Sequence, residues 1–90
     1  MTIVALRIKV MPTSPEVDLE EIKVKIKEKI ESQEGKINNM EEEPIAFGLK
    51  AIIVTIAWPE VKETDLAEDA IKEIENVSST QVIDYRRAFG

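Results

Sequence analysis

LKAIIVTIAW, residues 49–58, is the most strongly strand-like stretch of this 90-residue chain. Ile52, Val54 and Ile56 share one face of such a strand and Ile53 lies on the other, because side chains alternate along a strand. Apolar residues on both faces indicate a central position in a sheet. In a two-layer fold the second face is less covered, so we expect it to be available to a partner.

Three further segments have the pattern of strands. Residues 2–11 alternate apolar and polar side chains, which predicts a strand with one buried face before the break at PTSP, residues 12–15. Residues 36–43 are more polar and predict an edge strand, where charges discourage unwanted pairing. Within that segment, Glu41-Glu42-Glu43 is typical of a solvated edge rather than of an acid–base pair. Residues 80–87 predict the last strand.

Two helices are predicted between these strands. Asp18 has the position of an N-cap and Glu21 follows it in the sequence, so the pair predicts a capping box, and Gly35 is expected to end the helix. Thr64 is predicted to cap a second helix over residues 65–76, which the serines that follow would terminate. Both segments carry an apolar stripe at helical spacing, so each helix is expected to bury one side.

The predicted order is strand, helix, strand, strand, helix, strand. This is the split βαβ arrangement, an α+β ferredoxin-like fold with a four-stranded antiparallel sheet and two helices on one face. Right-handed crossovers place the first and third strands in the centre of the sheet. No repeat, low-complexity segment or linker divides the sequence, so we expect one domain over residues 1–90.

The composition excludes several kinds of chemistry. The chain has no His and no Cys, which excludes a histidine general base, a disulfide framework and a zinc site with these ligands. A Walker loop and a Gly-x-Gly-x-x-Gly motif are also absent from the sequence. We therefore expect no cofactor and no metal site. The sequence favours a binding protein that does no covalent chemistry of its own.

The net charge and hydropathy of the sequence limit the kinds of partner and the location that we expect. A formal net charge of −6 argues against a nucleic-acid binder, which usually presents a basic face to phosphates. It fits a partner protein with positive charge, although acidic charge also serves solubility alone. The sequence has neither a secretory signal nor an apolar stretch long enough to span a membrane. The chain is therefore expected to be cytoplasmic and soluble.

Two segments are not explained by folding alone. Phe47 precedes a glycine in the hinge between two predicted strands, where it is either tucked into the core or exposed as an aromatic anchor for a partner. Arg86 and Arg87 are adjacent in the last predicted strand of an acidic chain, so they point to opposite faces. They either protect an edge from aggregation or present a guanidinium to carboxylates or phosphates.

At these segments the sequence resembles a known family, the archaeal elongation factor 1-beta family of guanine nucleotide exchange factors for elongation factor 1-alpha. The resemblance covers the whole chain, and its most specific part is EEPIAFGL, residues 42–49. It also includes VMP, residues 10–12, and SPEVDL, residues 14–19. At the other end of the chain it includes VSS, residues 77–79, and DYRR, residues 84–87.

The resemblance implies a ferredoxin-like fold and a function in translation elongation. It implies binding to the GTPase elongation factor 1-alpha in its GDP-bound and nucleotide-free states, and exchange of GDP for GTP without covalent chemistry. Phe47 and Gly48, together with Ile45 and Lys50, are implied as partner contacts. Arg87, or alternatively Arg86, matches the position of a lysine that in eukaryotic members reaches the partner's magnesium and phosphate site.

Other ferredoxin-like modules remain as alternatives. A small-molecule-sensing or oligomerisation module of the ACT type requires a glycine in the turn after the first strand, and PTSP has none. An acylphosphatase-like hydrolase requires a phosphate-cradling loop with an embedded arginine, whereas Arg7 lies inside the first predicted strand. Both alternatives are weakened by these mismatches.

Overall fold

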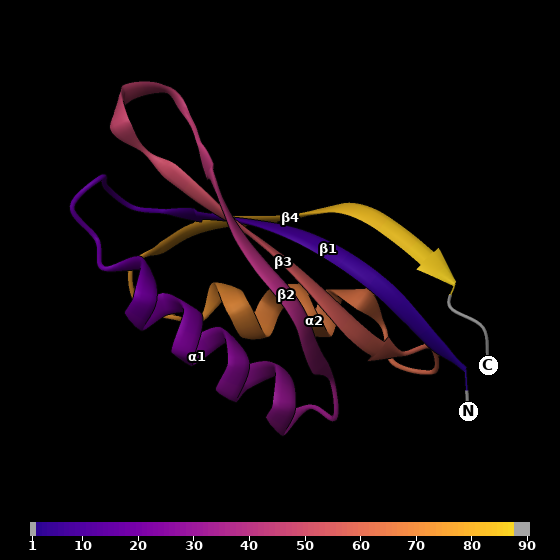
Figure 1. Ribbon diagram of the computed structural model, residues 1–90. Coiled ribbons are helices and arrows are strands. Elements are labelled where there is room, and N and C mark those ends of the chain that lie inside the picture. The colour runs from indigo at the N-terminus through magenta and orange to yellow at the C-terminus, as the bar shows by residue number, and fades with distance from the viewer. Residues whose placement is uncertain (1, 88–90) are drawn as a thin grey trace.

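Four strands form one antiparallel sheet in the order β2-β3-β1-β4, and both helices lie on the same face of it (Figure 1). The computed structural model describes residues 2–87. Its elements, in chain order, are β1 Ile3–Pro12, α1 Leu19–Ser32, β2 Lys36–Pro44, the short 3-10 helix η1 Ala46–Gly48, β3 Lys50–Pro59, α2 Thr64–Lys72 and β4 Val77–Arg87. The predicted α+β ferredoxin-like fold, with β1 and β3 in the centre, is confirmed.

The core lies between the sheet and the two helices. Alternate residues of the central strands face the helices, as the pairing of Val4 with Trp58 and of Ile8 with Val54 illustrates. Every large side chain that is fully buried is apolar, and together they join both central strands to both helices; they are Trp58, Leu6, Ile8, Ile26, Ile30, Ile52, Ile56, Ile71, Val4, Val10 and Val54. Burial of this apolar surface is the main term that stabilises so small a chain.

The other face of β3 corrects one expectation. Ala51 is fully buried and Ile53 is only 3 % exposed, so these side chains do not offer apolar surface to a partner. In the register Ile53 lies between Lys9 of β1 and Glu41 of β2. The stems of such long side chains shield apolar neighbours from water while their charged ends stay solvated. Ile53, which has a paired strand on each side, is therefore buried without a third layer.

The start of α1 is capped as predicted, with a different bonding partner. Asp18 has an extended backbone, and its Oδ1 accepts a hydrogen bond of 3.0 Å from the backbone N–H of Glu20. Because the bond goes to Glu20 rather than to Glu21, the N-cap is confirmed but the capping box is not. The cap satisfies one of the donors that the first turn of a helix leaves free.

The end of α1 gives Gly35 a role other than the predicted one. The helix ends at Ser32, and Glu34 is the residue that takes the left-handed conformation, with φ of 72°. The backbone N–H of Gly35 donates to the carbonyl of Ile30 at 2.9 Å. A Cβ on Gly35 would lie 2.7 Å from Cγ2 of Ile30 and 2.9 Å from Cε3 of Trp58. Gly35 is therefore required by close packing against Trp58.

The boundaries of α2 and β4 also differ from the prediction. The helix begins at Thr64 rather than after it, Glu63 is its N-cap without a side-chain hydrogen bond, and the helix ends at Lys72. Asn76, with φ of 72°, reverses the chain. β4 then starts at Val77, which packs against the core and pairs with Pro12. Ser78 and Ser79 therefore belong to the strand, because pairing with β1 outweighs their local preference for a turn.

Candidate partner-binding site

The hairpin of β2 and β3 projects beyond the rest of the sheet (Figure 1). The pairing of β1 with β3 ends at Val10 and Ile52, whereas β2 continues to pair with β3 as far as Pro44 and Lys50. Past Ile52, β3 therefore has only one neighbouring strand. The part of the hairpin beyond this level is a two-stranded ribbon that carries its turn away from the core.

The turn at the tip has an unusual residue in a strained conformation. Leu49 donates its backbone N–H to the carbonyl of Ala46 at 3.3 Å, and the two residues between them both have positive φ. Phe47 has φ of 63° and ψ of 29°, and Gly48 has φ of 77°. These angles are those of a type I′ turn, which normally selects Asn-Gly. A residue with a bulky side chain pays about 1–2 kcal/mol for this region.

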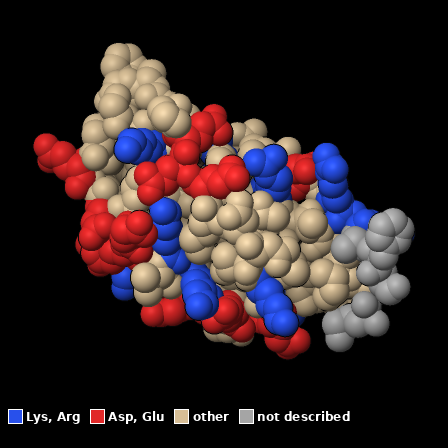
Figure 2. All heavy atoms as spheres, viewed as in Figure 1, with Lys and Arg blue, Asp and Glu red and all other residues tan. Residues whose placement is uncertain are grey.

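The side chain of Phe47 gains no packing in return for this strain. It is 93 % exposed, which excludes the alternative that it is tucked into the core. In Figure 2 the outermost part of the hairpin is an uncharged protrusion at the upper left, with charged side chains around its base. Backbone strain of this kind persists mainly where function requires it. The turn presents Phe47 as a rigid, protruding aromatic, the residue type that dominates binding hot spots.

The tip brings together all four residues that were predicted as partner contacts. Gly48 and Lys50 are exposed and Ile45 is half-buried. Ile45 also donates its backbone N–H to the carbonyl of Leu49 at 2.7 Å, which extends the ladder up to the turn and stiffens it. The four residues lie together at the end of the hairpin, and their role in binding stays a prediction.

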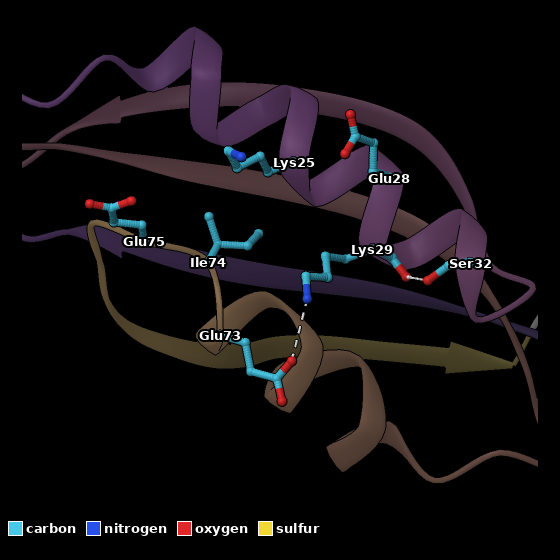
Figure 3. A pocket seen from close by; sticks show the side chains of 7 residues that line it. All are labelled: Lys25, Glu28, Lys29, Ser32, Glu73, Ile74 and Glu75. Atoms are coloured by element: carbon cyan, nitrogen blue, oxygen red, sulfur yellow. Dashed lines mark hydrogen bonds and ion pairs between the residues drawn. The ribbon is translucent and has the colours of Figure 1, made fainter.

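Two grooves flank the helices. One, of about 250 Å³, lies between α1 and the end of α2 (Figure 3), and it is lined by Lys25, Glu28, Lys29, Ser32, Glu73, Ile74 and Glu75. Its charges are mixed, and Lys29 is paired with Glu73 at 3.4 Å. The second, of about 240 Å³, lies below the hairpin tip and includes Gly48, Lys50 and Glu42 in its lining. Only the second groove adjoins the exposed aromatic.

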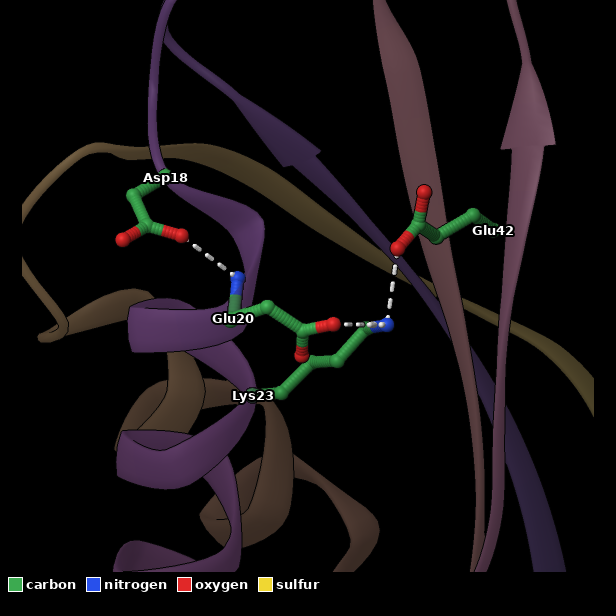
Figure 4. Close-up of polar contacts among 4 residues, drawn as sticks. All are labelled: Asp18, Glu20, Lys23 and Glu42. Carbon is green, nitrogen blue, oxygen red and sulfur yellow. Dashed lines mark hydrogen bonds and ion pairs between the residues drawn. The ribbon is translucent and has the colours of Figure 1, made fainter.

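The base of the hairpin is tied to α1 by an ion pair (Figure 4). Nζ of Lys23 donates to Oε2 of Glu42 at 2.8 Å and lies 3.6 Å from Oε1 of Glu20. The hydrogen bond from Lys23 and its positive charge lower the pKa of Glu42, with a smaller contribution from Lys50. The hydrogen bond to Glu42 likewise raises the pKa of Lys23 above its ordinary value. Both groups are therefore charged at neutral pH.

The two arginines lie at the end of β4. Nη2 of Arg87 donates to Oε1 of Glu60 at 2.7 Å, and Nε of Arg86 donates to Oδ2 of Asp84 at 3.0 Å. As adjacent strand residues they have opposite directions, so only one of them can serve a given face. Glu60 was not foreseen from the sequence. It follows the last residue of β3, and only the strand register shows that this position lies near the end of β4.

The hairpin tip and the arginines lie at opposite ends of the molecule (Figure 1). Arg87 pairs with Val4, which pairs with Trp58, whereas the tip begins at Lys50. Trp58 lies eight positions beyond Lys50 in β3, which is about 26 Å at about 3.3 Å per residue. The structure therefore does not bring Phe47 and Arg87 into one site, and a partner that contacts both must span the length of the sheet.

Among residues 2–87, no group of three or more acidic side chains is arranged to hold a metal ion. Within the same residues, no helix is long and apolar enough to cross a membrane. The distinctive features are an exposed aromatic on a stiff turn and a guanidinium at the far end of the sheet. They are the features of a small protein-binding domain.

Comparison with known proteins identifies the family. The sequence model of the EF-1 guanine nucleotide exchange domain family matches residues 5–87 of this chain. The chain is 44 % identical over 85 residues to elongation factor 1-beta of Methanocaldococcus jannaschii, and 46 % identical over 85 residues to that of Methanosarcina acetivorans. Each alignment covers 93 % of this chain and 96 % of the relative. The chain therefore belongs to the EF-1 guanine nucleotide exchange domain family, with archaeal elongation factors 1-beta as relatives.

Proposed function

We propose that this chain promotes the exchange of GDP for GTP on elongation factor 1-alpha during translation elongation. The family assignment supports exchange activity, and the name of the relatives supports this GTPase as the partner. The observation that carries the proposal to particular residues is the strained, 93 % exposed Phe47 at the tip of the hairpin. We expect the chain to act in the cytoplasm, bound to neither nucleic acid nor membrane.

Docking is assigned to the hairpin tip. Phe47 buries its ring in an apolar pocket of the partner, and Ile45, Gly48 and Lys50 contact the rim of that pocket. The turn is closed by two backbone hydrogen bonds before the partner arrives. Little conformational entropy is therefore lost on binding, and a preorganised aromatic binds more tightly than a flexible one.

The disturbance of the nucleotide site is assigned to Arg87. Its guanidinium carries donors in a planar fork suited to phosphates and carboxylates. In the free protein it is held by Glu60 at 2.7 Å, with 70 % of its side chain exposed. Anionic groups around the partner's Mg²⁺ can replace Glu60 as its acceptor. Arg86 is the alternative, but it points to the other face and is paired with Asp84.

Exchange then follows from differential binding. Mg²⁺ bridges the phosphates of a bound nucleotide to the protein, so a cation brought to that position competes with the ion and weakens GDP binding. The exchange domain binds the nucleotide-free GTPase more tightly than the GDP-bound form. It thereby shifts the population toward the empty state, to which GTP can bind. No covalent bond is made or broken in this cycle.

The test is release of a fluorescent GDP analogue from the cognate GTPase at increasing concentrations of the exchange domain. Wild type is expected to accelerate release. Phe47→Ala should raise the half-saturating concentration about tenfold, as expected for a hot-spot aromatic. Arg87→Ala should lower the maximal rate about tenfold or more, because a charged hydrogen bond is lost.

Arg86→Ala is the matched control, since it removes the neighbouring guanidinium from the opposite face. It is expected to behave like wild type. If Arg86→Ala lowers the maximal rate and Arg87→Ala does not, the role moves to Arg86. If wild type does not accelerate release at all, the proposed exchange activity is wrong. Circular dichroism of each variant establishes that the fold is retained.

A further inference from the structure

We propose that Lys23 is a positioning residue that fixes the direction of the β2–β3 hairpin, and with it the place of Phe47 in the complex. The proposal rests on the proposed function, in which the hairpin tip docks on the partner. Lys23 lies on α1 and reaches across to Glu42 of β2, so the pair connects a helix to a strand 19 residues away in the sequence. Its hydrogen bond and ion pairs are to Glu42 and Glu20, which lie outside the tip.

The ion pair lies at the level where the sheet narrows. Glu42 pairs with Ile52, and Ile52 pairs with Val10, which is the last position where β3 has strands on both sides. Beyond this level, two strands continue alone, and two-stranded ribbons are the most strongly twisted and least constrained part of a sheet. A contact at this level constrains the whole ribbon beyond it.

Among the three consecutive glutamates, only Glu42 can make this contact. Side chains alternate along β2, so Glu42 shares the helix-facing side with Ile52, and Glu41 and Glu43 point to the open face. Glu41 instead accepts a hydrogen bond from Asn39 at 3.1 Å. Expecting all three to form a solvated edge therefore overlooked the one that faces α1.

A small change at the base becomes a large displacement at the tip. Phe47 is five residues beyond Glu42, and the ribbon between them is at most about 16 Å long at about 3.3 Å per residue, because the last of these residues form the turn. A tilt of about 10° at the level of Glu42 would therefore move the aromatic by up to about 3 Å. A displacement of that size takes a docking side chain out of a pocket shaped for it.

The chain also contains a matched pair that lacks this connection. Lys29, on the same helix, is bonded to Glu73 at 3.4 Å and links α1 to the end of α2 rather than to the hairpin. Met replaces Lys in a helix at little cost in helix propensity and keeps an apolar stem of similar length. Lys23→Met and Lys29→Met therefore each remove one lysine charge and one ion pair that links α1 to another segment. Lys23→Met also removes the 3.6 Å pair with Glu20, which lies on α1 itself and does not hold the hairpin.

The first measurement is GDP release from the cognate GTPase at increasing concentrations of each variant. Lys23→Met is expected to raise the half-saturating concentration about threefold with an unchanged maximal rate, because the pair is partly exposed and Arg87 lies at the other end of the sheet. Lys29→Met should match wild type. Lys23→Arg retains the cation, so its half-saturating concentration should be close to that of wild type. An equal shift in both Met variants would overturn the proposal.

A double-mutant cycle tests whether Lys23 acts through Phe47. In the Phe47→Ala background, Lys23→Met should cause a smaller further rise in the half-saturating concentration than it does in wild type, because the aromatic is gone and only the rim contacts of the tip are left to position. Residues that act independently would give additive effects instead. Additivity would mean that Lys23 contacts the partner directly or contributes to general stability, and it would contradict a positioning role.

A third measurement needs no partner and so separates the two proposals. Backbone ¹⁵N order parameters of Ile45 and Leu49 are expected to fall in Lys23→Met and to stay unchanged in Lys29→Met, since only the first releases the hairpin. If wild type fails to accelerate GDP release while the order parameters fall in Lys23→Met, the exchange function is wrong and the positioning role of Lys23 is supported. If release is accelerated but both variants keep rigid tips, the positioning role of Lys23 is wrong.

Discussion

At the scale of single residues, Phe47 shows a conflict between local preference and observed structure. Its backbone lies in a region that favours Asn or Gly, and its ring is almost fully exposed. Neither hydrophobic burial nor turn propensity explains an aromatic there. Places where every folding rule points to another residue are expected at functional sites, because there the requirement comes from outside the fold.

This conflict predicts that Phe47→Asn stabilises the free protein. Asn adopts the left-handed region at a lower cost, and the ring of Phe47 makes no burial that would be lost. The free energy of unfolding measured in urea should rise by about 1 kcal/mol. Phe47→Ala, which keeps an ordinary Cβ in the same turn, should stay close to wild type. A clear loss of stability in Phe47→Asn would show that the ring packs against the domain after all.

Glycines illustrate what the sequence shows about single residues and what it does not. A glycine at the hinge before the strongest strand was expected to mark a turn, and Gly48 does so with φ of 77°. Gly35 was also expected to end a helix through its backbone conformation. Instead, its lack of a side chain leaves room for Trp58. A residue 23 positions further along the chain decides its role, and no local pattern reveals such a contact.

At the scale of elements, the strands and the first helix were predictable because each buries one face at a regular period. The predictions failed at the start of β4, where Val77 joins the core after a helix that ends four residues earlier than expected. Tertiary pairing with β1 sets that boundary. The ion pair of Lys23 with Glu42 was not predictable either, because it depends on how α1 lies against β2.

The Lys23–Glu42 pair predicts a specific pH dependence of stability. The lowered pKa of Glu42 means that its contribution is complete above its ordinary value of 4.5 and is lost as pH falls through the lowered value. The raised pKa of Lys23 means that its contribution is complete below 10.5 and is lost as pH rises through the raised value. The neighbouring charges of Glu20 and Lys50 act on the same two groups.

Urea unfolding of wild type and Lys23→Met over this pH range is the measurement. The difference in stability between the two proteins should be constant from about pH 5 to 10 and should shrink in acid, because wild type loses the pair while the variant has none to lose. Lys23→Met/Glu42→Gln removes both partners and should show no residual difference from Lys23→Met in acid. Parallel curves for wild type and Lys23→Met down to pH 3 would contradict the argument.

At the scale of the whole molecule, the sheet holds two predicted contact regions apart. The order of elements follows from the sequence, and with it the fold, since right-handed crossovers leave few arrangements for four strands and two helices. The relation between the hairpin tip and the end of β4 follows only from the register. Both regions were identified from their residue types, and their separation of about 26 Å is what the structure adds.

That separation predicts that the effects of Phe47→Ala and Arg87→Ala on exchange are independent. Substitutions well beyond about 10 Å apart, with no shared partner in the domain, usually add to within about 0.5 kcal/mol. In the double variant, the half-saturating concentration should therefore be that of Phe47→Ala, and the maximal rate should be that of Arg87→Ala. Lys23→Met combined with Phe47→Ala is the opposite case, because those two act on one hairpin. Strong coupling between Phe47 and Arg87 would mean that the partner's response links the two ends, and docking and nucleotide release would then be a single step.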